Sequence, residues 1–238
     1  MEPTPLRAAW HAAAEDWVGW ARSPEADHAF WSLNLPALEA LLPPPGELTL
    51  DVACGEGRVA RRLRALGHRV VGVEGSPALA AAAREADPGF EVHVADAVAV
   101  PLPDRVSDLV VSSLALMNMD DLGAAVREVA RLLAPGGRFC FSVLHPANTW
   151  GDAGDVDYFE TVRYAEAVES GGRRMTFHDT HRPLRDYFAA LEAAGFLVEA
   201  LREPTPADEH VAAAPHAERW RAKPGFLHVR AVLGYRKR

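Results

Sequence analysis

The sequence predicts an α/β fold, in which a mostly parallel sheet carries helices on both faces. Short apolar runs of strand length alternate along the chain with segments of helical periodicity, which is the order that parallel strands require. The first of these runs holds an acidic residue and enters a glycine turn. A chain of 238 residues with 49% apolar content is long enough for one such unit.

The chain begins with a predicted helical cap over residues 1–45. Residues 6–22 carry an apolar stripe at helical spacing, which indicates a helix packed along one face. The prolines of residues 43–46 end the next helix and lead into the first strand. The stripe consists of Trp10, Ala14, Trp17 and Ala21.

The predicted core, residues 46–145, opens with a strand, a glycine turn and a helix in residues 48–58. Gly55 and Gly57 can take backbone angles and close approaches that a Cβ would forbid, and the helix that follows presents free N–H groups to a polar ligand. This stretch predicts a nucleotide pocket. Its glycine spacing also satisfies the loose dinucleotide pattern, so two cofactor classes stay open at this point.

Two further runs also end in acidic residues. Residues 70–74 form a buried-strand run that ends at Glu74, where a carboxylate meets ribose hydroxyls in nucleotide sites. Residues 90–97 place Asp96 at the end of the next strand, where it can accept a hydrogen bond from an adenine amine. Residues 107–117 form a fourth run, and the turn at residues 135–137 ends a helix and starts a fifth strand.

These motifs together resemble the class I S-adenosylmethionine-dependent methyltransferases over roughly residues 48–145. The resemblance rests on Asp51, Ala53, Gly55 and Gly57, on Glu74, on Asp96 with Ala97, on Asp108, and on residues 133–137. It implies a Rossmann-like sheet of seven strands whose last strand inserts antiparallel between the fifth and the sixth. It also implies S-adenosyl-L-methionine as the cofactor.

The resemblance assigns a role to each strand end. The loop after the first strand would wrap the methionine part of the cofactor, Glu74 would hold both ribose hydroxyls, and Asp96 would lie beside the adenine. In the cap, Trp17 would shield the sulfonium and Arg22 would pair with the cofactor carboxylate. The implied cofactor-binding residues are Trp17, Arg22, Asp51, Ala53, Gly55, Gly57, Glu74, Gly75, Ser76, Asp96, Ala97, Ser113 and Leu114.

Two rival functions stay open. A nicotinamide-dependent oxidoreductase would explain Gly55, Gly57 and Glu74 but would leave Asp51, Asp96 and the turn at residues 135–137 unused. A protein of the same fold that binds the cofactor without methylation, or that uses it for other chemistry, has the same motifs.

An inserted lid is predicted over residues 146–180. Residues 162–168 and 173–178 read as two antiparallel strands joined by a turn at residues 170–172. By resemblance, such an insertion would roof the acceptor pocket. The segment also carries a group of acidic residues that we interpret as a solvated loop, namely Asp152, Asp155, Asp157 and Glu160.

Residues 181–238 complete the predicted sheet. Pro183 fits the first turn of a helix that ends at Gly195. A sixth strand over residues 196–201, a short helix over about residues 209–220 and a final strand over residues 226–233 follow.

Methyl transfer depends mainly on positioning and desolvation, and a hydroxyl acceptor would add the need for a base. His145 and His178 are the candidate bases, with His181 as a third, because an imidazole accepts a proton near neutral pH. A hydrogen-bonded structural role is the alternative for each. The grouping of His178, Asp179 and His181 lacks a fourth placed ligand, so we expect no metal site.

Charge and composition limit the partners. A net charge of −8 without Lys/Arg-rich runs excludes a general attraction to nucleic acid, so we expect a small-molecule methyl acceptor. The sequence holds no apolar run long enough for a membrane span and no signal-peptide pattern, and we expect a cytoplasmic protein. Its two cysteines, Cys54 and Cys140, exclude a disulfide framework.

Overall fold

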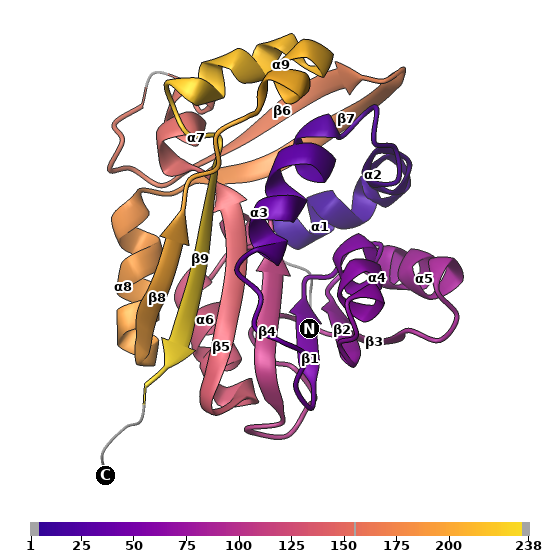
Figure 1. The fold of residues 1–238 in the computed structure, drawn as a ribbon, viewed down its shortest axis with the longest axis vertical. Coiled ribbons are helices and arrows are strands. Elements are labelled where there is room, and N and C mark those ends of the chain that lie inside the picture. Colours follow the sequence, from indigo (N-terminus) through magenta and orange to yellow (C-terminus); the bar gives the residue numbers. More distant parts are fainter. Residues whose placement is uncertain (1–4, 155, 235–238) are drawn as a thin grey trace.

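The computed structural model describes residues 5–154 and 156–234, the side chain of Asp152 excepted. Within these residues, seven strands form one sheet in the order β3-β2-β1-β4-β5-β9-β8 (Figure 1). Pairing is parallel from β3 to β5, and β9 runs antiparallel to both of its neighbours. The predicted fold class and the insertion of the last strand are confirmed. The strands are β1 (Thr49–Val52), β2 (Val70–Glu74), β3 (Glu91–Val94), β4 (Ser107–Ser113), β5 (Leu133–Leu144), β8 (Phe196–Arg202) and β9 (Phe226–Leu233).

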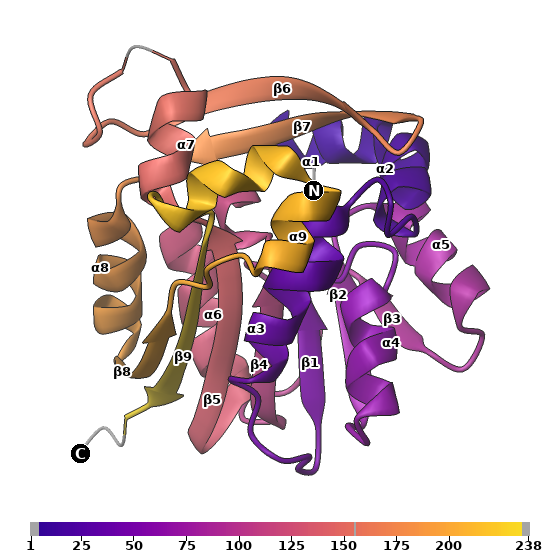
Figure 2. The ribbon, with the colours of Figure 1, turned by 45° about the horizontal axis from the view of Figure 1, so that its top comes forward.

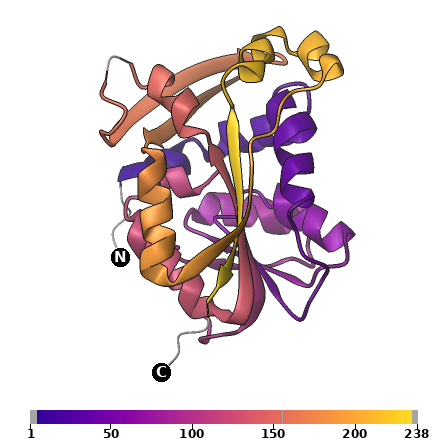
Figure 3. The ribbon, with the colours of Figure 1, turned by 60° about the vertical axis from the view of Figure 1, so that its left-hand side comes forward.

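Helices cover both faces of the sheet, as Figure 3 shows with the two layers on either side of it. Successive strand residues point to opposite faces. Val110 therefore packs in the cluster under α6 and α8, whereas Val111 packs in the cluster under α3, α4 and α5. These helices are α3 (Leu35–Glu39), α4 (Arg58–Ala65), α5 (Pro77–Ala86), α6 (Leu122–Leu132) and α8 (Leu184–Ala194).

The N-terminal stripe folds as two helices, α1 (Pro5–Ala12) and α2 (Ala14–Ala21), where the sequence predicted one. Ala13 leaves helical geometry with φ −87° and ψ 8°. Across the break, the rings of Trp10 and Trp17 lie 5.3 Å apart in an edge-to-face contact. A π-helical turn, η1 (Phe30–Asn34), continues the chain into α3.

The helix predicted over residues 209–220 is also interrupted. It consists of α9 (Asp208–Ala213) and a 3₁₀ segment, η3 (Pro215–Arg221). Pro215 has no N–H to donate and disfavours the helical region for the residue before it. Ala214 accordingly has φ −137° and ψ 80°.

The turn predicted at residues 135–137 lies inside β5 as a bulge. The helix before it ends at Leu132, and the pairing with β4 passes from Leu133 directly to Arg138. A Cβ on Gly137 would meet the Ala134 carbonyl oxygen at 2.8 Å, so the compact bulge requires glycine there.

The lid segment begins with α7 (Pro146–Asp152) and forms a separate hairpin, β6 (Val162–Ser170) and β7 (Arg173–His181), as predicted. The hairpin lies over α1 and α2, above the carboxyl ends of the parallel strands (Figures 1 and 2). Of the predicted acidic loop, Asp157 and Glu160 are exposed, while Asp155 and the Asp152 side chain lie outside the described residues. Among the described helices, none is long and apolar enough to cross a membrane.

Candidate functional site

A cavity of about 220 Å³ opens at the carboxyl ends of β1, β2, β3 and β4, beneath α1 and α2. Parallel α/β sheets bind their ligands at this edge. Almost all of the predicted cofactor-binding residues line the cavity, although they come from distant parts of the chain. The residues brought together here are Trp17, Asp51, Ala53, Gly55, Glu74, Gly75, Ser76, Asp96, Ala97, Ser113 and Leu114.

Glu74 joins the two loops that form the floor of the cavity. Its carboxylate is buried and accepts hydrogen bonds from the backbone N–H groups of Gly55 and Ser76, each at 2.8 Å. Burial raises the pKa of Glu74, and these N–H groups oppose the rise. The carboxylate is therefore held in place before any ligand arrives.

Asp51 is the least satisfied acid of the cavity. It is 1% exposed, and its Oδ2 has no hydrogen-bond partner among the described residues. Burial, and then the charge of Glu74, raise the pKa of Asp51 to about 7. A buried acceptor oxygen of this kind fits a ligand that brings a cationic or hydrogen-donating group.

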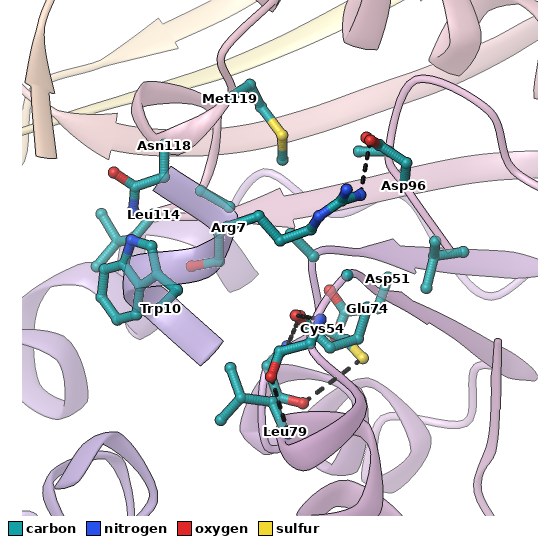
Figure 4. A pocket seen from close by; sticks show the side chains of 18 of the residues that line it. Arg7, Trp10, Asp51, Cys54, Glu74, Leu79, Asp96, Leu114, Asn118 and Met119 are labelled. Carbon is teal, nitrogen blue, oxygen red and sulfur yellow. Dashed lines mark hydrogen bonds and ion pairs between the residues drawn. The ribbon is translucent and has the colours of Figure 1, made fainter. Parts of the chain in front are cut away.

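The Asp96 carboxylate is occupied by the N-terminal helix. Arg7 Nη1 donates to Asp96 Oδ2 at 2.7 Å, and the Val98 N–H donates to Oδ1 at 3.2 Å. The Arg7 side chain lies against the backbone of Gly75, where a Cβ would meet Arg7 Cδ at 2.8 Å. Figure 4 shows Arg7 reaching across the cavity to Asp96.

Trp10 and Trp17 form the wall under the hairpin. Phe177 of β7 contacts both rings edge-to-face, with centroids at 6.5 and 6.3 Å. The Trp17 indole N–H lies close to the glycine turn, 3.3 Å from the position of a Cβ on Gly55. Trp17 therefore lies at the glycine turn, in the lining of the cavity.

Two backbone positions of the cavity are strained. Ala53 has φ 58° and Leu114 has φ 51°, both in the left-handed region that non-glycine residues rarely adopt. Such strain persists only where the surrounding structure enforces it, and it concentrates at functional sites. Both residues belong to the predicted cofactor set.

Arg22 and Gly57 lie outside the described lining. Arg22 Nε donates to Glu56 Oε2 at 2.8 Å, and its Nη2 donates to the Ala82 carbonyl oxygen at 2.9 Å. The guanidinium predicted to meet a cofactor carboxylate is therefore engaged elsewhere. Gly57, with φ 84°, is the residue directly before α4 and allows the glycine turn to enter that helix.

The candidate bases are also away from the described lining of the cavity. His145 caps α7, because its Nδ1 accepts from the Ala147 N–H at 3.0 Å, and its Nε2 lies 2.9 Å from Glu203. Burial lowers the pKa of His145, while Glu203 opposes this. His181 is bound by Thr149 and the Tyr158 carbonyl oxygen. His178 contributes its backbone carbonyl, which accepts from Trp10 Nε1 at 3.0 Å.

Several lining residues escaped the sequence analysis, among them Arg7, Trp10, Arg58, Asn118 and Met119. Trp10 belongs to the same stripe as Trp17, which is a signal that was available. Asn118 and Met119 follow the fourth strand run directly, within η2 (Leu116–Asn118) and just after it. Among the described residues, no group of three or more His, Cys, Asp or Glu side chains is placed to hold a metal ion.

Comparison with known proteins relates the chain to methyltransferases. A family model described as "Methyltransferase domain" matches residues 50–141. The chain is 30% identical to the S-adenosylmethionine-dependent methyltransferase of Mesorhizobium loti, with a TM-score of 0.66 over 86% of this chain and 97% of that one.

Two curated relatives are more similar over shorter stretches. The malonyl-acyl-carrier protein O-methyltransferase of Serratia marcescens is 37% identical over 112 residues, which cover 47% of this chain and 44% of the relative. The ubiquinone/menaquinone biosynthesis C-methyltransferase UbiE of Caulobacter vibrioides is 34% identical over 133 residues, which cover 50% and 52%. The chain thus spans about half the length of the curated relatives it matches.

Proposed function

Because the chain belongs to the S-adenosylmethionine-dependent methyltransferase family, we propose that it transfers a methyl group from S-adenosyl-L-methionine to a small-molecule metabolite. The buried and unpartnered Oδ2 of Asp51 gives this proposal its main support. The cofactor carries an ammonium group and a sulfonium, and an orphaned buried carboxylate oxygen suits such a cationic ligand.

The remaining cavity residues fit the same cofactor. Glu74, already oriented by two backbone N–H groups, would accept from the ribose hydroxyls, and Asp96 would lie at the adenine end. Gly55 leaves room for the methionine part beside Trp17. The bound cofactor supplies an electrophilic methyl on positively charged sulfur, while the chain orients both reactants and excludes water.

We propose that this chain relies on positioning and desolvation rather than on an imidazole base. His145 uses its Nδ1 lone pair to cap a helix, and His178 presents a backbone carbonyl to Trp10. Replacing either histidine by Ala tests the base assignment, because a base would lower kcat with little effect on cofactor affinity. Equal loss of both quantities, or of neither, would support the structural role.

The cofactor class is tested by calorimetry on the purified chain with S-adenosylhomocysteine and with NAD. We expect micromolar affinity for the first and none for the second, followed by transfer of labelled methyl from S-adenosylmethionine to compounds of a metabolite extract. Preference for NAD would establish the oxidoreductase alternative. Tight S-adenosylhomocysteine binding without any labelled product would favour a protein that uses the cofactor for other chemistry.

A further inference from the structure

The cavity has a second wall, of which only Leu114 belongs to the predicted cofactor set. Trp10, Leu114, Asn118 and Met119, here called the acceptor wall, lie across the cavity from the Asp51 and Glu74 floor, with Arg7 passing between them (Figure 4). Three of its four side chains are apolar or aromatic, and the Trp10 indole N–H is already bonded to the His178 carbonyl oxygen. The wall therefore favours a flat and largely apolar molecule.

The cations of the cavity are already paired with carboxylates. Among the described lining residues these cations are Arg7 and Arg58. Arg7 pairs with Asp96 at 2.7 Å, and the buried Arg58 pairs with Asp27 at 2.6 Å. The Arg58 guanidinium also lies over the Phe30 ring at 3.3 Å. An acceptor that carried a carboxylate would have to break one of these pairs to bind either of the two lining arginines.

The floor opposite the acceptor wall adds to this discrimination. Asp51 and Glu74 are both buried carboxyl groups without a cationic partner in the described structure. In the proposed complex the cofactor occupies this floor and pairs with both acids, so the floor supplies no side-chain cation to an anionic acceptor. Neither the floor nor the paired arginines of the described lining therefore offers a negatively charged acceptor a partner.

Asn118 supplies the polar contact of the acceptor wall. In the amide orientation that satisfies both of its ends, Asn118 Nδ2 donates to Asp179 Oδ1 at 2.9 Å and to the His178 carbonyl oxygen at 3.0 Å. Both donated bonds hold the side chain against β7. In the same orientation Oδ1 faces hydrogen-bond donors of the chain. A carbonyl oxygen only accepts and has two lone pairs, so Oδ1 can take a further hydrogen from a ligand.

From these contacts we propose that the methyl acceptor is an uncharged, ring-shaped molecule that donates a hydroxyl or amine hydrogen to Asn118 Oδ1, and that it is not a carboxylate. This proposal rests on the methyltransferase function. The names of the two curated relatives contain groups of both kinds, because a malonyl group is anionic and a quinone is a neutral ring, and the proposal favours the second kind.

The test uses the full chain loaded with S-adenosylhomocysteine and two matched probes, 2-naphthol and 2-naphthoate, which share a ring system and differ in charge at pH 7.5. We expect calorimetry to give 2-naphthol an affinity at least about tenfold higher, since an unpaired buried charge is costly. Equal or tighter binding of 2-naphthoate would overturn the proposal, as would binding of neither probe. Failure of S-adenosylhomocysteine itself to bind is a separate result, which would overturn the proposed function.

Asn118→Leu tests the anchor itself. This change keeps the branching and the number of heavy atoms of the side chain and should lower 2-naphthol affinity about three- to tenfold, the effect of one hydrogen bond, with S-adenosylhomocysteine affinity unchanged. Asn148→Leu is the matched control, because Asn148 lies on α7 outside the described lining and bonds to Trp220. An unchanged 2-naphthol affinity in Asn118→Leu, or an equal loss in both variants, would overturn the role of Asn118.

Discussion

Asp51 has a raised pKa, and this property links the pH to both stability and ligand binding. Its carboxyl group loses solvent and stands near a second acid, so its proton is retained up to a pH of about 7. The unfolded chain loses the same proton near pH 3.8. The stability that this protonation gives to the fold is therefore present below pH 3.8 and is lost as the pH rises to about 7. A bound cationic ligand would stabilise the ionised carboxylate of Asp51.

Cofactor affinity should therefore depend on pH through Asp51. Below pH 7, a ligand with an ammonium group must displace the Asp51 proton, so S-adenosylhomocysteine affinity should fall by up to about tenfold per pH unit. Calorimetry at pH 6, 7 and 8, in two buffers with different ionisation enthalpies, would count the released proton. Asp51→Asn should abolish the slope. A flat affinity across this range in the unmodified chain would contradict the assignment.

Glu74 should contribute to affinity more than its exposed neighbours in the sheet. Replacing Glu74 by Ala removes the ribose acceptor and the tie between two loops, and should weaken S-adenosylhomocysteine binding by about one to two orders of magnitude, or roughly 1.5–3 kcal/mol. Glu91→Ala, on the exposed start of β3, is the control and should change little. Equal affinities for the two variants would remove Glu74 from the ribose site.

At the scale of elements, the loop before β1 depends on β4. Asp108 lies at the start of β4, away from the cavity, and accepts from the backbone N–H groups of Glu47 at 2.7 Å and Leu48 at 3.2 Å. A Cβ on Gly46 would come within 1.5 Å of Asp108 Oδ2. Asp108, which entered the sequence motif as part of the family pattern, therefore acts here as a structural link between two strands.

Gly46→Ala should destabilise the fold by about 1–3 kcal/mol, because the new methyl group displaces the Asp108 carboxylate from two backbone bonds. Urea unfolding followed by circular dichroism would measure the change. Gly123→Ala provides a matched control. Gly123 lies in the first turn of α6 and faces the flexible end of Arg127, so alanine there should be neutral or slightly stabilising. Equal stabilities of the two variants would refute the role of Asp108.

At the scale of the whole molecule, the cap and the hairpin are tied to the core by charged side chains. Arg22 pairs with Glu56, and Asp27 pairs with Arg58. Both cap residues follow α2, and they join the cap to the glycine turn and to α4. On the other side, Arg163 of β6 pairs with Asp120, which lies between η2 and α6. Ion pairs of this kind cross the predicted boundaries between cap and core and between core and lid.

We therefore predict that residues 1–238 unfold as one domain. Differential scanning calorimetry should give a single transition whose calorimetric and van't Hoff enthalpies agree. Saturating S-adenosylhomocysteine, at about a hundred times its Kd, should raise the stability by about 2.7 kcal/mol and move the whole transition upward. A second transition that ignores the ligand would show that the cap or the hairpin unfolds independently.

The strands and their acids could be predicted because they depend on local pattern. Apolar runs of strand length, a glycine turn and a Pro-Gly-Gly turn can each be recognised from a few neighbouring residues. The break at Ala13 could not be predicted, because Trp10 and Trp17 pack there against Phe177 of the distant hairpin. Secondary-structure signals carry no information about contacts over that distance.

The same difference between local pattern and distant contact applies to the cavity: the sequence predicted residues of its floor but not Arg7 and Asn118. Glu74 and Asp96 follow strands, and parallel strands bring their ends together whatever the rest of the chain does. Arg7 reaches Asp96 from a helix that is separated from it by 89 residues, and Asn118 is oriented by β7. The role of His145 as a cap had a local signal, since Pro146 follows it at the first helical position.

The position of β9 also bears on how the chain is synthesised. This strand lies between β5 and β8, although it follows both in the chain. A nascent chain that ends before Phe226 leaves β5 as an open edge, with the side chains of Phe139, Phe141 and Val143 not yet fully covered. Unpaired strand edges recruit other strands, so the interval before residues 226–233 are available is the period of greatest risk of aggregation.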